Sequence, residues 1–123
     1  MKTILLVEDE FGIAGVLTVL LEDAGYRVFS AANGRQALNW MAEITPDLVI
    51  TDFMMPLMDG AALGQALRGN LAWKDVPIIL MSAVPEATVR QRFDGYTFFL
   101  RKPFQTEALI DLTAHIVSGE TRA

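Results

Sequence analysis

The stretch LVITD, residues 48–52, places four apolar or β-branched residues directly before a carboxylate. Three further apolar runs also lead into polar residues whose chemistry does not suit a core. They are ILLV (4–7) before Glu8 and Asp9, IILM (78–81) before Ser82, and FFL (98–100) shortly before Lys102. Continuous apolar runs are typical of strands that are covered on both faces of a parallel sheet. If these runs are neighbouring parallel strands, three carboxylates, a hydroxyl and an ammonium converge at one edge of the sheet.

Strand and helix patterns alternate about five times along the chain. Strands are expected at 3–7, 26–30, 47–51, 76–81 and 96–100. The stretch YRVFS (26–30) alternates apolar and polar residues, which indicates a strand at the edge of the sheet. Strands that alternate with helices imply right-handed crossovers and a parallel sheet with helices on both faces. We therefore predict a doubly wound α/β fold in three layers.

Apolar spacing and capping residues mark the helices. The first helix has apolar residues at the spacing of one inward face, namely Ile13, Val16, Leu17, Leu20, Leu21 and Ala24, and it ends at Gly25. Asn33 is expected to cap the second helix, with Gln36 three residues later as in a capping box. Further helices are expected at 60–69 after an Asp59 cap, from Pro85 to about Phe93, and at 104–117.

The composition predicts one globular domain over residues 1–123. The formal net charge is −5 and the Lys and Arg residues are scattered, so we expect no direct nucleic-acid partner. The apolar runs are too short to cross a membrane, and the first stops at Val7, too early for a signal peptide. Cysteine is absent, which excludes disulfides, thiolate catalysis and cysteine-based metal sites. We expect a cytoplasmic protein without membrane contact.

Open α/β sheets bind ligands beyond the carboxyl ends of their strands, where the unusual polar residues lie. Mg²⁺ prefers oxygen ligands, which Asp9 and Asp52 can supply directly and Glu8 can supply directly or through water. The alternative is that these acids only favour a helix dipole or start a turn. An Asp52 partly buried near Asp9 would repel it unless a cation or a lysine intervenes, and Lys102 can be that lysine. Alone, Lys102 is also consistent with a surface lysine, and Ser82 with a helix cap.

The sequence resembles the receiver domain of two-component response regulators over almost its whole length. The matching motifs are Glu8-Asp9, Asp52, MPLMDG (55–60), Ser82-Ala83 and Lys102-Pro103-Phe104. The resemblance implies a flavodoxin-like sandwich with five helices and a five-stranded parallel sheet in the order 2-1-3-4-5.

By this resemblance Asp52 is the phosphoryl acceptor, and Lys102 and Ser82 contact the phosphoryl oxygens. Mg²⁺ is held by Asp9, Asp52 and the backbone carbonyl of Met54, with Glu8 assisting. Phe99 falls at the switch position of the family, although it is equally consistent with a core phenylalanine. The donor would be a histidine kinase or phosphotransfer protein, and the signal would pass to a downstream protein. The chain would catalyse only its own phosphorylation and dephosphorylation.

Two features depart from the family. Lys102 follows Ser82 by 20 residues, a shorter spacing than is usual, so the fourth helix or its loop must be shortened around 90–96. Met54 and Val84 flank the route by which water would attack the phosphoryl group, and neither side chain can orient that water. We therefore predict slow hydrolysis of the aspartyl phosphate.

Two other functions are alternatives to this reading. A Mg²⁺-dependent aspartyl-phosphate phosphatase of the haloacid-dehalogenase type needs a second aspartate two residues after the nucleophile, where Met54 stands. A receiver-like interaction module that is never phosphorylated has no need of the complete set of acids, serine and lysine. The sequence is equally consistent with a stand-alone protein and with a receiver excised from a longer hybrid kinase or regulator.

Overall fold

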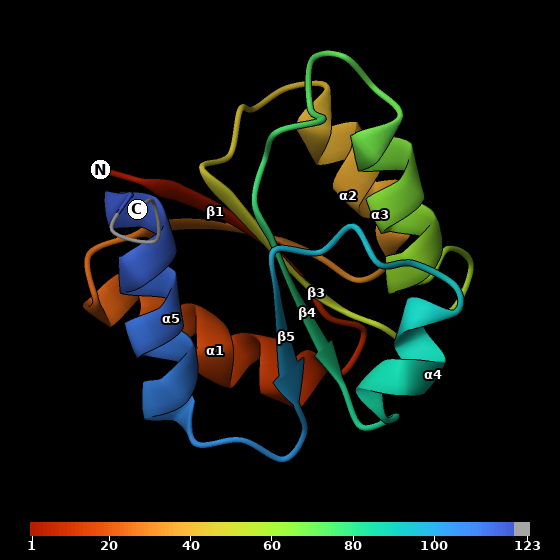
Figure 1. The fold of residues 1–123 in the computed structure, drawn as a ribbon. Coiled ribbons are helices and arrows are strands. Elements are labelled where there is room, and N and C mark those ends of the chain that lie inside the picture. The colour runs from red at the N-terminus through yellow and green to blue at the C-terminus, as the bar shows by residue number, and fades with distance from the viewer. Residues whose placement is uncertain (120–123) are drawn as a thin grey trace.

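Five parallel strands form one sheet in the order β2-β1-β3-β4-β5, as the resemblance implied (Figure 1). The computed structural model describes residues 1–119. The strands are β1 (Thr3–Val7), β2 (Arg27–Ala31), β3 (Leu48–Asp52), β4 (Ile78–Ser82) and β5 (Phe98–Arg101). Strand β2 lies at an edge, which confirms the prediction drawn from its alternating pattern.

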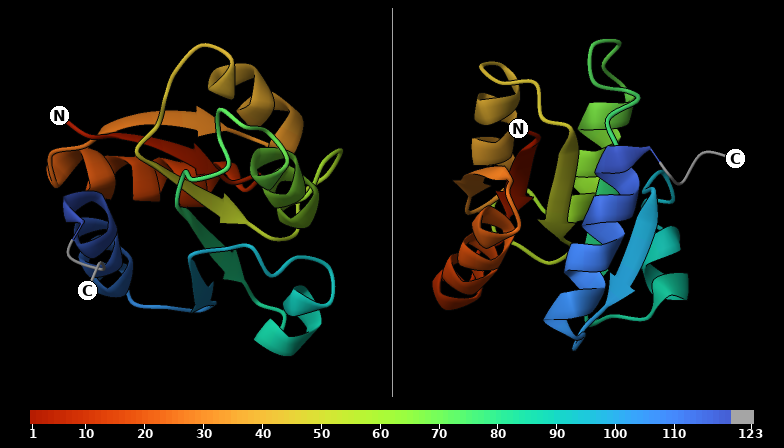
Figure 2. Two further views of the ribbon diagram at one scale, coloured as in Figure 1. Left: turned by 45° about the horizontal axis from the view of Figure 1, so that its top comes forward. Right: turned by 90° about the vertical axis from the view of Figure 1, so that its left-hand side faces the viewer.

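Helices cover both faces of the sheet (Figure 2). One layer contains α1 (Phe11–Asp23) and α5 (Thr106–Ser118), and the other contains α2 (Gly34–Met41), α3 (Gly60–Arg68) and α4 (Glu86–Arg90). Successive strand residues alternate between the two cores: Leu5 and Val49 pack toward one layer, Leu6 and Ile50 toward the other. The apolar runs are continuous because each central strand is buried on both sides.

The predicted caps of the second and third helices are confirmed. The Asn33 side chain accepts a hydrogen bond from the Gln36 amide at 3.0 Å, and Asp59 accepts one from the Ala62 amide at 2.9 Å. The Gln36 side chain accepts from the Ala32 amide at 2.8 Å, so the capping box closes one residue earlier than its usual form.

The predicted inward face of α1 is partly wrong. Leu17 and Leu21 are buried, but Ile13 and Val16 are 42% and 57% exposed and Ala24 is also exposed. Residues 11–21 contain no charged side chain, so apolar residues occur all round the helix. Apolar spacing therefore could not distinguish the face that packs on the sheet from the face that does not.

Two helix boundaries also differ from the prediction. Helix α4 ends at Arg90, and not near Phe93, because Phe93 is buried against Gly64 of α3. The Arg92 carbonyl accepts a hydrogen bond from the Gln65 side chain at 2.6 Å. Helix α5 begins at Thr106, two residues later than predicted, since Gln105 is an extended N-cap. Within the described residues, no helix has the length and apolarity to cross a membrane.

Candidate functional site

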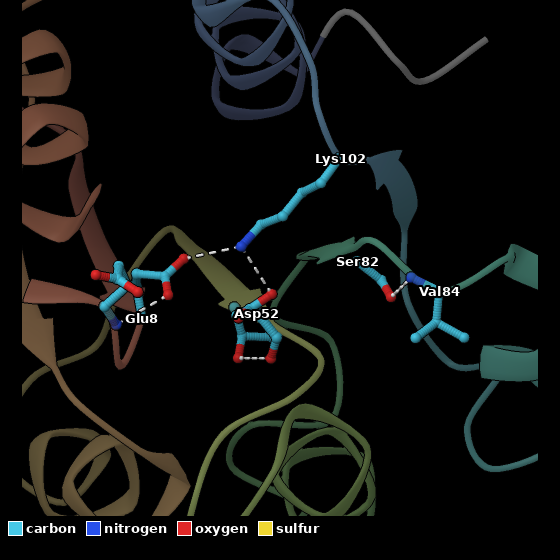
Figure 3. Close-up of polar contacts among 7 residues, drawn as sticks. Glu8, Asp52, Ser82, Val84 and Lys102 are labelled. Atoms are coloured by element: carbon cyan, nitrogen blue, oxygen red, sulfur yellow. Dashed lines mark hydrogen bonds and ion pairs between the residues drawn. The ribbon is translucent and has the colours of Figure 1, made fainter. Parts of the chain in front are cut away.

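The carboxyl ends of β1, β3, β4 and β5 lie level at one edge of the sheet, as the sequence predicts. Asp52 pairs with Met81 in register, and Ser82 pairs with Arg101. The predicted side chains follow at these ends: Glu8 after β1, Asp52 and Ser82 as the last residues of their strands, and Lys102 after β5 (Figure 3). Parallel pairing therefore brings together residues that are up to 94 positions apart.

Three carboxylates form a compact cluster. Ligand oxygens of Glu8, Asp9 and Asp52 all lie within 4.8 Å of one another. Glu8 and Asp52 are buried, at 3% and 8% exposure, whereas Asp9 is exposed and keeps the cluster open to solvent. A set of only oxygen donors with one solvent-facing side suits a hard divalent cation that retains some of its water.

Lys102 bridges two of the carboxylates. Its Nζ lies 3.1 Å from Asp52 Oδ1 and 3.2 Å from Glu8 Oε1, and these contacts are drawn in Figure 3. The Lys102 amide also donates to the Ser82 carbonyl at 2.8 Å, which fixes the segment after β5 against β4. Three carboxylates and one ammonium leave two negative charges, which one divalent cation would neutralise.

The electrostatics of the cluster favour cation binding. Burial raises the pKa of the Asp52 carboxyl, and the charge of Asp9 raises it further, although Lys102 opposes the shift. Burial likewise raises the pKa of Glu8, with a smaller contribution from Asp52. Burial alone would lower the pKa of Lys102, but the two carboxylates outweigh it and raise the pKa. The lysine therefore stays charged, while the carboxylates are less stable as anions than ordinary ones.

Ser82 lies at the same edge but is turned away from Asp52. Its Oγ accepts a hydrogen bond from the Val84 amide at 2.9 Å, and Figure 3 shows the side chain directed toward that residue. Because the hydroxyl serves here as an acceptor, it retains a proton that it can donate elsewhere.

The loop after Asp52 folds back on β3. A Cβ on Gly60 would lie 2.3 Å from the Asp52 backbone carbonyl, so the close approach requires glycine. The Gly60 amide donates to the Phe53 carbonyl at 2.8 Å. Sequence reasoning assigned no role to Gly60, although the MPLMDG motif contains it.

Among the other predicted residues, Met54 is 64% exposed and Phe99 is partly buried against the core. Sequence reasoning also missed Arg92, which forms an ion pair with Asp59 at 2.5 Å and lies 5.7 Å over the Phe53 ring. Arg92 is 33 residues from Asp59, so no local pattern could have revealed this contact.

Comparison with known proteins agrees with this geometry. Residues 4–114 match the family described as response regulator receiver domain. A receiver domain of a signal transduction histidine kinase from Syntrophus aciditrophicus superposes with a TM-score of 0.90 at 34% identity, over 100% of this chain and 95% of that one. The response regulator TrrA of Thermotoga maritima, solved in complex with Mg²⁺-BeF, gives a TM-score of 0.85 at 30% identity over 94% and 99% of the two chains.

The curated relatives are longer. The DNA-binding dual master transcriptional regulator RpaA of Synechocystis sp. is 32% identical over 89% of this chain but only 46% of its own length. The chain spans about half the length of the curated relatives it matches. These relatives are named as regulators and not as enzymes.

RpaA corrects one prediction. The expectation of no nucleic-acid partner is wrong for this group of proteins, because RpaA is a DNA-binding regulator. The distribution of Lys and Arg concerns only these 123 residues, so it carries no information about DNA binding by a longer protein. The family match and the acidic, serine and lysine side chains at one sheet edge lead to the same conclusion: the chain belongs to the response regulator receiver domain family.

Proposed function

We propose that this receiver takes a phosphoryl group onto Asp52 from a histidine kinase or phosphotransfer protein and signals to a protein partner by a change in surface conformation. The position of the Asp52 carboxylate is the main support for this function. It lies 3.1 Å from the Lys102 ammonium and within 4.8 Å of two other acidic side chains. We further propose that residues 1–123 act as one receiver domain in the cytoplasm.

The chemistry is a direct transfer. An Asp52 carboxylate oxygen attacks the phosphorus of the donor's phosphohistidine in line, and the bond from phosphorus to the imidazole nitrogen breaks as the new acyl phosphate forms. Lys102, whose ammonium lies 3.1 Å from Asp52 Oδ1, would neutralise charge on the transferred oxygens. Ser82 would give up its contact with the Val84 amide and donate its hydroxyl proton to one of those oxygens.

Asp9, Asp52 and the Met54 carbonyl would hold Mg²⁺, with Glu8 assisting directly or through water. When bound, Mg²⁺ supplies positive charge against the oxygens of the incoming phosphoryl group. The fit rests on the donor set, which is made only of oxygens and leaves two negative charges after Lys102 is counted. The chain would act on no substrate other than its own aspartyl phosphate.

Acetyl phosphate and Mg²⁺ provide the test. Intact mass should show one added phosphate in the wild type and in Asp111→Asn, which removes an exposed carboxylate of α5, but none in Asp52→Asn. EDTA should also abolish the product. Release of phosphate without a modified protein would favour the phosphatase alternative, and an unmodified, inactive protein would favour an interaction module.

A further inference from the structure

Helix α4 is short and is fastened to its surroundings at both ends. It has five residues, too few to be stable by its own hydrogen bonds. Val89 is fully buried and anchors the middle of the helix. At the start of the helix Glu86 accepts a hydrogen bond from the Tyr96 hydroxyl at 2.5 Å, and beyond its end Arg92 pairs with Asp59. Val89 and these polar contacts together hold the helix in place.

Tyr96 is held firmly in its position. Its ring packs against Phe93 and Phe99, with ring centroids 6.3 Å and 5.9 Å away. Burial and the hydrogen bond to Glu86 raise the pKa of Tyr96 to about 12. The hydroxyl is therefore protonated near neutral pH and remains a donor to the carboxylate.

Glu86 is connected to the phosphorylation site through a short piece of backbone. Ser82 ends β4, and its Oγ accepts from the Val84 amide. Pro85 is the N-cap of α4, with φ of −57°, and Glu86 is the first residue of the helix. A rotation of Ser82 toward Asp52 breaks its bond to Val84 and pulls on a segment that ends at Glu86.

We propose that Tyr96 is a positioning residue that, through Glu86, holds the loop after β4 in the conformation in which Ser82 faces the Val84 amide. The proposal rests on the function proposed above. The Tyr96–Glu86 hydrogen bond is made in the conformation described here and is released when Ser82 turns to the phosphoryl oxygens. A contact present in only one of two states shifts the equilibrium toward that state. Removal of the Tyr96 hydroxyl therefore favours the phosphorylated conformation.

The test uses Tyr96→Phe, which keeps the ring and removes the donor. Its initial rate of phosphorylation by acetyl phosphate, followed by intact mass, should rise about five-fold, the effect of losing one partly exposed hydrogen bond. The beryllofluoride concentration that half-saturates the protein in excess Mg²⁺ should fall by about the same factor. Affinity for Mg²⁺ alone should not change, because the carboxylate cluster is untouched. A purely structural role would not produce this combination.

Matched variants complete the experiment. Tyr26→Phe removes the only other tyrosine hydroxyl and should behave as wild type. Glu86→Ala removes the acceptor and should reproduce the effect of Tyr96→Phe, and the double variant should show no further increase. Circular dichroism checks folding; if Tyr96→Phe were unfolded, Glu86→Ala would provide the same comparison.

The outcomes separate the two proposals. If the wild type is phosphorylated on Asp52 but both variants react at the wild-type rate or more slowly, the positioning role of Tyr96 is overturned and the function stands. Additive effects in the double variant would also overturn it. If the wild type gains no phosphate on Asp52, the proposed function itself fails.

Discussion

Replacing Lys102 with methionine should tighten Mg²⁺ binding and at the same time slow the phosphorylation of Asp52. The ammonium lies 3.1 Å from Asp52 Oδ1 and 3.2 Å from Glu8 Oε1. It therefore contacts two of the three carboxylates that a bound cation would also contact. The substitution removes this positive charge and keeps an unbranched apolar side chain of similar length.

The distances give the size of the effect. An ion about 2.1 Å from Asp52 Oδ1 would lie at most about 5 Å from the lysine Nζ. Repulsion between one and two positive charges within that separation is at least about 1.7 kcal/mol with the dielectric constant of water, and larger in a partly buried site. Removing it corresponds to Mg²⁺ binding that is at least about ten-fold tighter. Loss of the lysine also raises the pKa of both carboxyls further, so proton competition is minimised by working at pH values of about 8.

Isothermal titration calorimetry with MgCl₂ at low ionic strength measures the affinity. Lys74→Met is the matched control, because it removes the same charge from an exposed side chain whose partner is Asp75. With saturating Mg²⁺, phosphorylation of Lys102→Met by acetyl phosphate should be slower by about a hundred-fold or more, since one preorganised positive charge is lost. Mg²⁺ affinity no greater than that of Lys74→Met would refute the electrostatic description of the site.

Three further predictions concern stability and turnover. In metal-free buffer at neutral pH, Asp52→Asn should raise the unfolding midpoint, because burial raises the pKa of the Asp52 carboxyl and its charged form opposes folding. This gain should vanish as the pH falls below the ordinary aspartate pKa of about 3.9, which thermal melts across pH can test. Thr113→Val should stabilise the fold by about 1 kcal/mol in urea titrations, because the buried Thr113 Oγ1 has no hydrogen-bond partner among residues 1–119; a loss of stability would contradict this. Met54→Asn combined with Val84→Glu should hydrolyse the aspartyl phosphate faster in a phosphate-release assay, since both side chains could then orient water; an equal or slower rate would count against the prediction that Met54 and Val84 slow this hydrolysis.

The parts of the structure that follow from strand chemistry were predictable from the sequence. Neighbouring parallel strands bring their carboxyl ends to one edge of the sheet, so the apolar runs alone were enough to locate Glu8, Asp52 and Ser82 there. Lys102 followed from the same argument.

Features set by tertiary contacts were not predictable. The face of α1 could not be assigned because residues 11–21 are uncharged throughout, and exposed Ile13 resembles buried Leu17 in sequence. The end of α4 depends on Phe93 packing against Gly64, 29 residues earlier in the chain. The ion pair of Arg92 with Asp59 spans a similar separation and leaves no local pattern.

The alternation of strand side chains between the two helical layers has a consequence for how this chain can vary. Inserting one residue within β3 would reverse the sides on which its later side chains lie, moving apolar groups into the wrong layer and misaligning the Asp52 carboxylate. The number of residues in β3 therefore fixes the position of the Asp52 carboxylate. Helix length is less constrained, as the five-residue α4 illustrates, whereas the number of residues in β3 must stay the same.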